Sequence, residues 1–113
     1  MDDCIFCKIA KGEIPSDIVL KDDVVMVIRD IDPKAPQHLL AIPIEHIDSC
    51  ADINDHNSAV VARLFTEMAC IAREGGFEDG FRIVSNTGES AGQSVKHLHF
   101  HLLAGRDFGW PPG

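Results

Sequence analysis

The sequence contains no long hydrophobic run, no internal repeat and no low-complexity segment. None of its 113 residues falls in an apolar stretch of 18 or more, which a membrane-spanning helix would need. The first ten residues, MDDCIFCKIA, lack the charged region followed by a long apolar region that marks a secretory signal. We therefore expect a single soluble domain over residues 1–113, a cytoplasmic location and no membrane partner.

Positive charge is also scarce. The chain has 10 Lys and Arg residues against 18 Asp and Glu residues, for a net charge of −8 at pH 7. General nucleic-acid binders normally present a basic patch, so we expect no nucleic-acid partner. A mononucleotide is not excluded, because a helix N-terminus or a few backbone N–H groups can hold one phosphate.

The chain has only four cysteines. Cys50 and Cys70 stand alone in the sequence, and we expect them to pack as small apolar residues. Cys4 and Cys7 form a C-x-x-C motif, which in an intracellular chain indicates a metal or redox site before a structural disulfide. A thioredoxin-type role is disfavoured because the motif opens the chain and does not follow a strand. A pair of buried thiols is the alternative.

Hydrophobic patterning predicts a short helix, three strands, a long helix and two strands. Residues 4–11 form the short helix, which Gly12 and Pro15 end. Apolar residues at i, i+3, i+4 spacing predict the long helix from Val60 to Ala72, with Asn54 or Asn57 as its cap and Gly75-Gly76 as its stop. The strands are predicted over Ile18–Leu20, Val24–Ile28, His38–Ile42, Phe81–Ser85 and Val95–Ala104.

This order of elements favours an antiparallel α+β fold, because helices and strands do not alternate regularly as in a parallel α/β sheet. Five strands and one long helix would leave one face of the sheet thinly covered. We therefore expect a homodimer in which the sheet extends across two copies.

Three histidines at alternate positions, in the segment HLHFHLL, stand out in the sequence. In an extended strand, side chains point to opposite faces with period two. His97, His99 and His101 would then share one face, with Leu98 and Phe100 on the other. The face could be polar without a function, could hold a catalytic zinc with an open position, or could carry out nucleophilic catalysis.

The cysteine pair bears on this choice, because two thiolates need two more ligands to close a tetrahedral zinc site and histidine is the usual supplement. Such a site would use two of six histidines and could not use all three of the alternating ones. The six are His38, His46, His56, His97, His99 and His101.

Two further segments have two interpretations each. The Gly- and Ser-rich residues 86–94 are typical of a hairpin loop, but their backbone N–H groups could also cradle an anion. Asp30 and Asp32 are either solvated turn carboxylates or acceptors for ribose hydroxyls.

The segment HLHFHLL resembles the H-φ-H-φ-H-φ-φ signature (φ apolar) of the histidine triad (HIT) superfamily of nucleotide hydrolases and transferases. The resemblance covers nearly the whole chain. It extends through IFCKIAKGEIP, the run from Asp30 to His38, the IPxxH segment at Ile42–His46 and AGQSVKHLHFHLLAGRDFGWPPG. The terminal WPPG is similar to the Hint branch of phosphoramidases and not to the diadenosine-polyphosphate hydrolases. The resemblance implies a single HIT domain that forms a homodimer.

The resemblance also implies a reaction: cleavage of nucleoside (adenosine) 5′-monophosphoramidates at their P–N bond, or of aminoacyl adenylates. His99 would attack the phosphorus and form a covalent nucleotidyl-histidine, and His101 would contact the phosphate and move protons. A neutral imidazole is needed for that attack, and a hydrogen bond from its other N–H to a backbone carbonyl would fix its tautomer. The rival functions are a dinucleoside polyphosphate hydrolase and a nucleotide-binding sensor or partner protein with incidental turnover.

The remaining site residues follow from the same resemblance. The implied catalytic residues are His99, His101, His38 and Ser94. Asp30 would bind the ribose, with Phe6, Ile28 and Ile31 around the purine base. Asn86, Gly92, Gln93 and Ser94 would hold phosphate and leaving-group atoms, and Trp110 would reach the partner subunit's active site.

The cysteine pair separates this chain from the animal Hint proteins and makes it similar to bacterial members that contain zinc. In those members, the matching positions Cys4, Cys7, His46 and His97 would bind a structural zinc. The metal would clamp the N-terminal turn to the catalytic strand, and no catalytic metal is expected.

Overall fold

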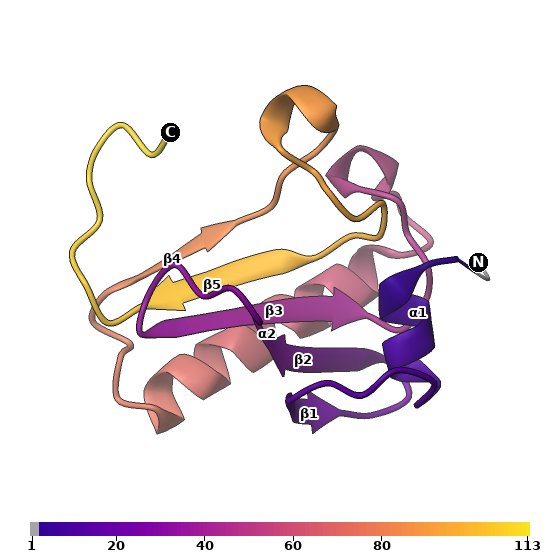
Figure 1. The fold of residues 1–113 in the computed structure, drawn as a ribbon, viewed down its shortest axis with the longest axis horizontal. Coiled ribbons are helices and arrows are strands. Elements are labelled where there is room, and N and C mark those ends of the chain that lie inside the picture. Colours follow the sequence, from indigo (N-terminus) through magenta and orange to yellow (C-terminus); the bar gives the residue numbers. More distant parts are fainter. Residues whose placement is uncertain (1–2) are drawn as a thin grey trace.

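Two helices and five strands follow one another in the predicted order in the computed structural model, which describes residues 3–113. Neighbouring strands are all antiparallel, in the order β1-β2-β3-β5-β4, so the predicted α+β fold is confirmed (Figure 1). The elements are α1 (Ile5–Ala10), β1 (Ile18–Lys21), β2 (Val25–Arg29), β3 (Gln37–Pro43), α2 (Ser58–Glu74), β4 (Phe81–Val84) and β5 (Phe100–Ala104), with short 3₁₀ helices η1 (Cys50–Asp52) and η2 (Glu89–Ala91).

The two central strands are buried on both faces, and their side chains alternate between two apolar clusters. Val25 and Val27 of β2 pack in the first cluster, on the side of α2, which contributes Leu64 and Met68. The second cluster lies on the opposite face, where Met26 and Ile28 of β2 meet Phe6 and Ile9 of α1. Each face of β2 and β3 is thus covered by a different helix (Figure 1).

The second face is covered only over β2 and β3, because α1 has six residues. Further along the sheet, His101 of β5 pairs with Leu40 on one side and with Val84 on the other. Directly paired residues share a face of the sheet. The face of β5 and β4 that carries His101 is therefore open, as the element count predicted.

Both helices end as the sequence predicts. Cys4 caps α1, with its Sγ accepting a hydrogen bond from the Cys7 N–H at 3.4 Å. Gly12 then takes a positive φ of 79°, which glycine adopts without a steric penalty. Asn57, and not Asn54, is the cap residue of α2, and Gly75 ends it.

The lone cysteines differ from one another. Cys50 packs against the first cluster, as predicted. Cys70 lies on the surface of α2 and directs its thiol to Glu74 Oε1 at 3.4 Å, so the prediction of apolar packing is wrong for this residue. The helical i, i+4 spacing brings the two side chains together.

The last strand is shorter than the sequence predicts, since β5 begins at Phe100 and not at Val95. The ladder between β3 and β5 runs from Gln37–Ala104 to Ala41–Phe100. Two positions further, β3 reaches Pro43, which has no N–H to donate. The Leu98 N–H bonds instead to the Ile47 carbonyl, at 2.6 Å. Two of the three alternating histidines therefore lie before the strand.

No helix among residues 3–113 is long and apolar enough to cross a membrane.

Candidate functional site

Four aromatic rings form a row along the open part of the second face. Phe6 of α1 meets the His99 ring edge-on at a centroid distance of 5.1 Å. The His99 and His101 rings lie 5.2 Å apart, and the His101 and His38 rings 5.1 Å apart. Although His99 precedes the strand, the period-two alternation persists, because Leu98 and Phe100 enter the opposite cluster. His99 and His101 therefore face the same side of the sheet, as the sequence predicts, although only His101 lies within the strand.

The tautomer of His99 follows from its hydrogen bond. Its Nδ1 lies 2.7 Å from the carbonyl oxygen of His97, and a carbonyl can only accept. The neutral ring therefore carries its proton on Nδ1, and Nε2 keeps a free lone pair. The side chain is 6% exposed, so this orientation is held within a packed environment. This is the backbone carbonyl contact that the sequence analysis expects for His99.

A chain of hydrogen bonds fixes the other two histidines in the same way. The Lys34 N–H donates to His38 Nδ1 at 3.0 Å, so a neutral His38 carries its proton on Nε2. That Nε2 lies 2.9 Å from His101 Nδ1 and donates to it. A neutral His101 therefore carries its proton on Nε2, where it is available to a bound molecule.

Burial keeps these two histidines neutral. Burial, together with the neighbouring His99 and His38, lowers the pKa of His101 to about 4. Burial also lowers the pKa of His38, against the opposing effect of Asp30. In the free protein at neutral pH, His101 is thus a hydrogen-bond donor and not a cation.

Asp30 lies at the His38 end of the row. Its Oδ2 is 3.4 Å from His38 Nε2, and its Oδ1 accepts from the Asp32 N–H at 2.8 Å. Asp30, His38 and His101 also lie close enough together to hold a metal ion. The direct His38–His101 hydrogen bond already uses the two facing nitrogens, however. Asp32 points elsewhere, to Lys34 Nζ at 2.8 Å.

The C-x-x-C motif meets two histidines at the other end of the site. Cys4 Sγ lies 3.2 Å from His97 Nδ1, and Cys7 Sγ lies 3.4 Å from His46 Nδ1 and 3.6 Å from His97 Nδ1. All four candidate ligand atoms fall within 4.8 Å of one another. The structure therefore brings together the four residues that the resemblance implied.

The donor set fits a tetrahedral zinc site. Zn–S bonds of about 2.3 Å and Zn–N bonds of about 2.0 Å place tetrahedral sulfur and nitrogen ligands about 3.6 Å apart. The second ring nitrogens are also in use: His46 Nε2 bonds Asp48 Oδ1 and His97 Nε2 bonds the Pro43 carbonyl, each at 2.8 Å. Such contacts orient metal-binding histidines and leave Nδ1 unprotonated for the metal.

The residues predicted to contact the base or the partner subunit's active site lie in two environments, buried and exposed. Phe6 and Ile28 belong to the second cluster, next to the histidine row. Ile31 is 97% exposed and Trp110 is 85% exposed. Neither is buried within this chain, so their predicted contacts require a bound nucleotide or a second copy.

The Gly-rich loop forms η2, and several of its N–H groups are used within the loop. The N–H groups of Ala91, Gly92 and Gln93 donate to carbonyls within the loop. The side-chain amide of Gln93 is also occupied, with bonds to Asp48 O, Val95 O and the Gly88 N–H. The hairpin-loop interpretation describes these groups better than the cradle.

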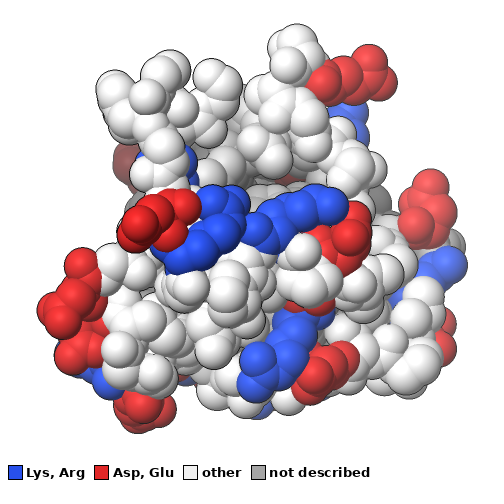
Figure 2. All heavy atoms as spheres, turned by 60° about the vertical axis from the view of Figure 1, so that its left-hand side comes forward, with Lys and Arg blue, Asp and Glu red and all other residues white. Residues whose placement is uncertain are grey.

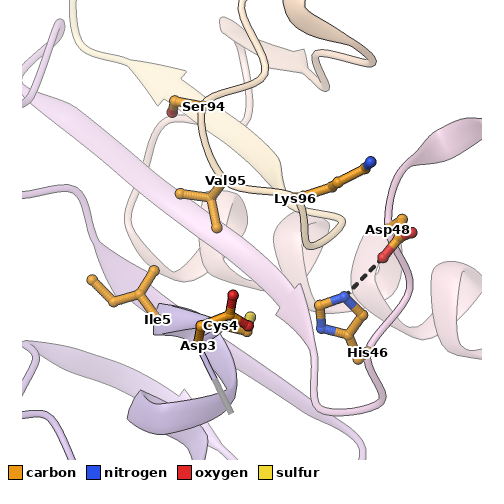
Figure 3. A pocket seen from close by; sticks show the side chains of 8 residues that line it. All are labelled: Asp3, Cys4, Ile5, His46, Asp48, Ser94, Val95 and Lys96. Atoms are coloured by element: carbon orange, nitrogen blue, oxygen red, sulfur yellow. Dashed lines mark hydrogen bonds and ion pairs between the residues drawn. The ribbon is translucent and has the colours of Figure 1, made fainter. Parts of the chain in front are cut away.

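Ser94 lines a cavity of 470 Å³ on the outer side of the Cys/His cluster, with Cys4, His46, Asp48 and Lys96 among the other residues. Figure 3 shows this cavity, with the His46–Asp48 contact at its wall. Among residues 3–113, Ser94 makes no side-chain hydrogen bond to the triad. Its predicted catalytic role stays a prediction.

A second cavity, of 280 Å³, adjoins the histidine row itself. His38 and His101 form part of its wall, together with Asn86, which the sequence analysis had selected. Lys34, Arg82 and Arg106 also line it, and sequence reasoning missed these three. Figure 2 shows Lys and Arg side chains gathered in a band across the end of the molecule that carries the C-terminal tail. The alternation of side chains along β4 could have placed Arg82 on the face that carries His101.

Comparison with known proteins agrees with this arrangement. A family model described as "Scavenger mRNA decapping enzyme C-term binding" matches residues 3–108. The purine nucleoside phosphoramidase of Escherichia coli is 45% identical over 109 residues, which cover 96% of this chain and 92% of that protein. A 14 kDa zinc-binding protein of Zea mays is 43% identical over 111 residues, covering 96% and 87%.

Among solved structures, a HIT family hydrolase from Legionella pneumophila superposes with a TM-score of 0.95 at 45% identity. The match covers 98% of this chain and all of that one. With the alternating histidines on the open face of a five-stranded antiparallel sheet, these matches show that the chain belongs to the histidine triad superfamily of hydrolases.

Proposed function

We propose that the protein hydrolyses nucleoside 5′-monophosphoramidates or aminoacyl adenylates, with His99 as the nucleophile. The observation that carries this proposal is the 2.7 Å contact between His99 Nδ1 and the His97 carbonyl. It directs the unprotonated Nε2 away from the backbone as a competent nucleophile. The name of the 45% identical Escherichia coli relative supports a purine phosphoramidate as substrate.

The reaction has two displacement steps. The Nε2 lone pair of His99 attacks the phosphorus, and the P–N bond of a phosphoramidate, or the P–O bond to the carboxylate of an aminoacyl adenylate, breaks with its electron pair leaving on that nitrogen or oxygen. A leaving nitrogen takes a proton from the imidazolium form of His101, because a neutral imidazole has no proton acidic enough to give. Water then attacks the phosphorus, the P–Nε2 bond breaks with its electron pair returning to His99, and the proton of the water restores His101.

The position of His101 in the hydrogen-bond chain suits this role. The bond from His38 fixes the Nε2–H of neutral His101 as a donor to a phosphoryl oxygen. The negative charge of a bound phosphate raises the pKa of His101 from its low value in the free protein. The site can thus take up a proton as the substrate binds. Asp30, beside His38, is in position to accept ribose hydroxyls.

Replacing His99 tests the covalent step. We expect His99→Ala to lower kcat/KM for adenosine 5′-phosphoramidate at least about a thousandfold, because no other group supplies the attacking lone pair. Rapid quenching followed by mass spectrometry of the wild type should detect a nucleotidyl adduct on His99. His56→Ala, at an exposed histidine outside the site, is the matched control. Near-wild-type turnover by His99→Ala would exclude the covalent route.

We further propose that Cys4, Cys7, His46 and His97 bind a structural zinc. The support is the ligand geometry described above and the zinc-binding name of the Zea mays relative. When bound, the metal links α1 to the segments that carry the two histidines and supplies no catalytic group. It is a cross-link between parts of the chain far apart in sequence.

The zinc proposal predicts a loss of metal on mutation. The double variant Cys4→Ser/Cys7→Ser should lose close to one zinc per chain in elemental analysis, since hydroxyls are poor zinc ligands. We also expect it to unfold at a lower denaturant concentration, because metal binding contributes to folding free energy. Cys70→Ser should keep the metal. Full zinc content in the double variant would contradict the assignment.

A homodimer joined through β4 is the third part of the proposal. β4 is an edge strand, with unpaired backbone groups that can pair with a second copy. Phe81 on this strand is 38% exposed, and Phe65 of α2, which packs on Phe100, is 43% exposed. The highly exposed Trp110 would then reach the partner subunit's active site.

Sedimentation equilibrium tests the dimer. We expect a mass twice the 12.4 kDa of one chain and dissociation by Phe81→Lys, since an edge lysine opposes strand pairing. Val19→Lys makes the same change on β1, the other edge strand, and should leave the dimer intact. A monomeric wild type at micromolar concentration would refute the proposal.

The low pKa of His101 predicts a pH dependence of stability. Between its ordinary value near 6.5 and its folded value of about 4, the unfolded chain binds more protons than the folded one. The free energy of unfolding therefore falls as the pH is lowered through this window, by up to about 1.4 kcal/mol per pH unit from this group. Urea unfolding of His101→Gln should show a shallower loss than the wild type. Parallel pH profiles would show that His101 titrates alike in both states.

A further inference from the structure

Two arginines without carboxylate partners meet at the 280 Å³ cavity. Among residues 3–113, neither Arg82 nor Arg106 forms an ion pair, although Arg29 and Arg63 do. Arg73 forms no ion pair among these residues either, but it does not line the cavity. A guanidinium has five N–H donors. Arg82 uses one of them and Arg106 two in the bonds below, and the rest are available to a ligand.

Both guanidinium groups are nevertheless held in place. Arg82 donates to the Gly109 carbonyl at 2.8 Å, and Arg106 donates to the Lys34 carbonyl at 3.0 Å and the Asp107 carbonyl at 2.9 Å. The Phe108 ring lies against both, with centroid distances of 5.2 Å to Arg82 and 4.3 Å to Arg106. Two positive charges thus lie against one ring and line one cavity, where an anion would offset their repulsion. Lys34 also lines the cavity, but its Nζ is paired with Asp32.

Strand register relates this cavity to the histidines. Leu103 of β5 pairs with His38 on one side and with Arg82 on the other, so all three share a face. With strands about 4.8 Å apart, Arg82 lies two strands, or about 10 Å, from His38. Asp30 follows β2, on the far side of β3. A substrate with its ribose at Asp30 and its leaving group directed across the sheet towards β4 would reach this cavity.

We propose that Arg82 and Arg106 form an anion subsite for the leaving group, so that the preferred substrates carry a negative charge there. The charged group is a carboxylate or a phosphate, a few bonds beyond the scissile nitrogen or oxygen. This inference rests on the proposed function, since it deepens the substrate class of the same site. Guanidinium forks bind either anion through charge-assisted hydrogen bonds.

A matched pair of substrates tests the subsite. The P–N conjugates of AMP with β-alanine and with β-alaninamide have the same length and differ by one negative charge. For the wild type, we expect kcat/KM to favour the β-alanine conjugate by about tenfold or more. Arg82→Gln and Arg106→Gln should each reduce this ratio severalfold. Arg73→Gln, at an exposed arginine near the end of α2, should leave the ratio at the wild-type value.

Diadenosine triphosphate provides a third arm, since its leaving group is ADP. If its kcat/KM exceeds that of the β-alanine conjugate and falls in both arginine variants, the subsite serves phosphates; the reverse order assigns it to carboxylates. A ratio near one in the wild type, or a ratio that neither arginine variant changes, would overturn the subsite.

The two proposals fail in different ways. If neither conjugate is hydrolysed, the proposed function is wrong, but both compounds then persist as ligands. Calorimetric titration gives a Kd for each, and the Kd ratio in the wild type and the arginine variants tests the subsite independently. Equal Kd values would overturn it, and tighter binding of the charged conjugate that depends on the arginines would support it.

Discussion

His97 is the residue on which the geometry of the site depends, because three of its polar atoms contact three different parts of the molecule. Its Nδ1 faces the two cysteine sulfurs, its Nε2 bonds the Pro43 carbonyl, and its own carbonyl accepts from His99 Nδ1. With 1% of its surface exposed, it has little freedom to move. His97, which belongs to the proposed metal centre, thus fixes through its backbone carbonyl the tautomer of the proposed nucleophile. A disturbance of the cysteine pair can therefore reach His99 through His97.

A second set of constraints acts from the opposite end of the row. The Lys34 N–H sets the tautomer of His38, and His38 sets that of His101. Neutral imidazoles accept on one side and donate on the other, so the direction of the whole chain is decided by one backbone N–H. His99 thus offers a lone pair and His101 an N–H donor, although both are histidines and lie two positions apart. The difference between the proposed nucleophile and the hydrogen-bond donor lies in what their Nδ1 atoms contact.

Much of this could be predicted from local sequence. The α+β order, the helix ends and the four-residue Cys/His cluster follow from periodicity, cap residues and a motif with its resemblance. The start of β5 could not, because it depends on Pro43 of another strand and on the Leu98–Ile47 bond. The bond from the Gln93 amide to the Asp48 carbonyl and the packing of Arg82 against the Phe108 ring also join residues that are far apart in sequence. Each needs the register between strands, which no single segment specifies.

The short helix α1 connects the proposed metal centre to the proposed nucleotide site. A helix of six residues is too short to be stable in isolation, and two of its buried residues are needed elsewhere: Cys7 in the Cys/His cluster and Phe6 against His99. Anchoring Cys4 and Cys7 therefore positions Phe6 as well. Because the helix is no longer than this anchor requires, it leaves β5 and β4 uncovered. That open face is where a phosphate can approach His99 from solvent, with apolar Phe6 on one side and the cationic cavity on the other.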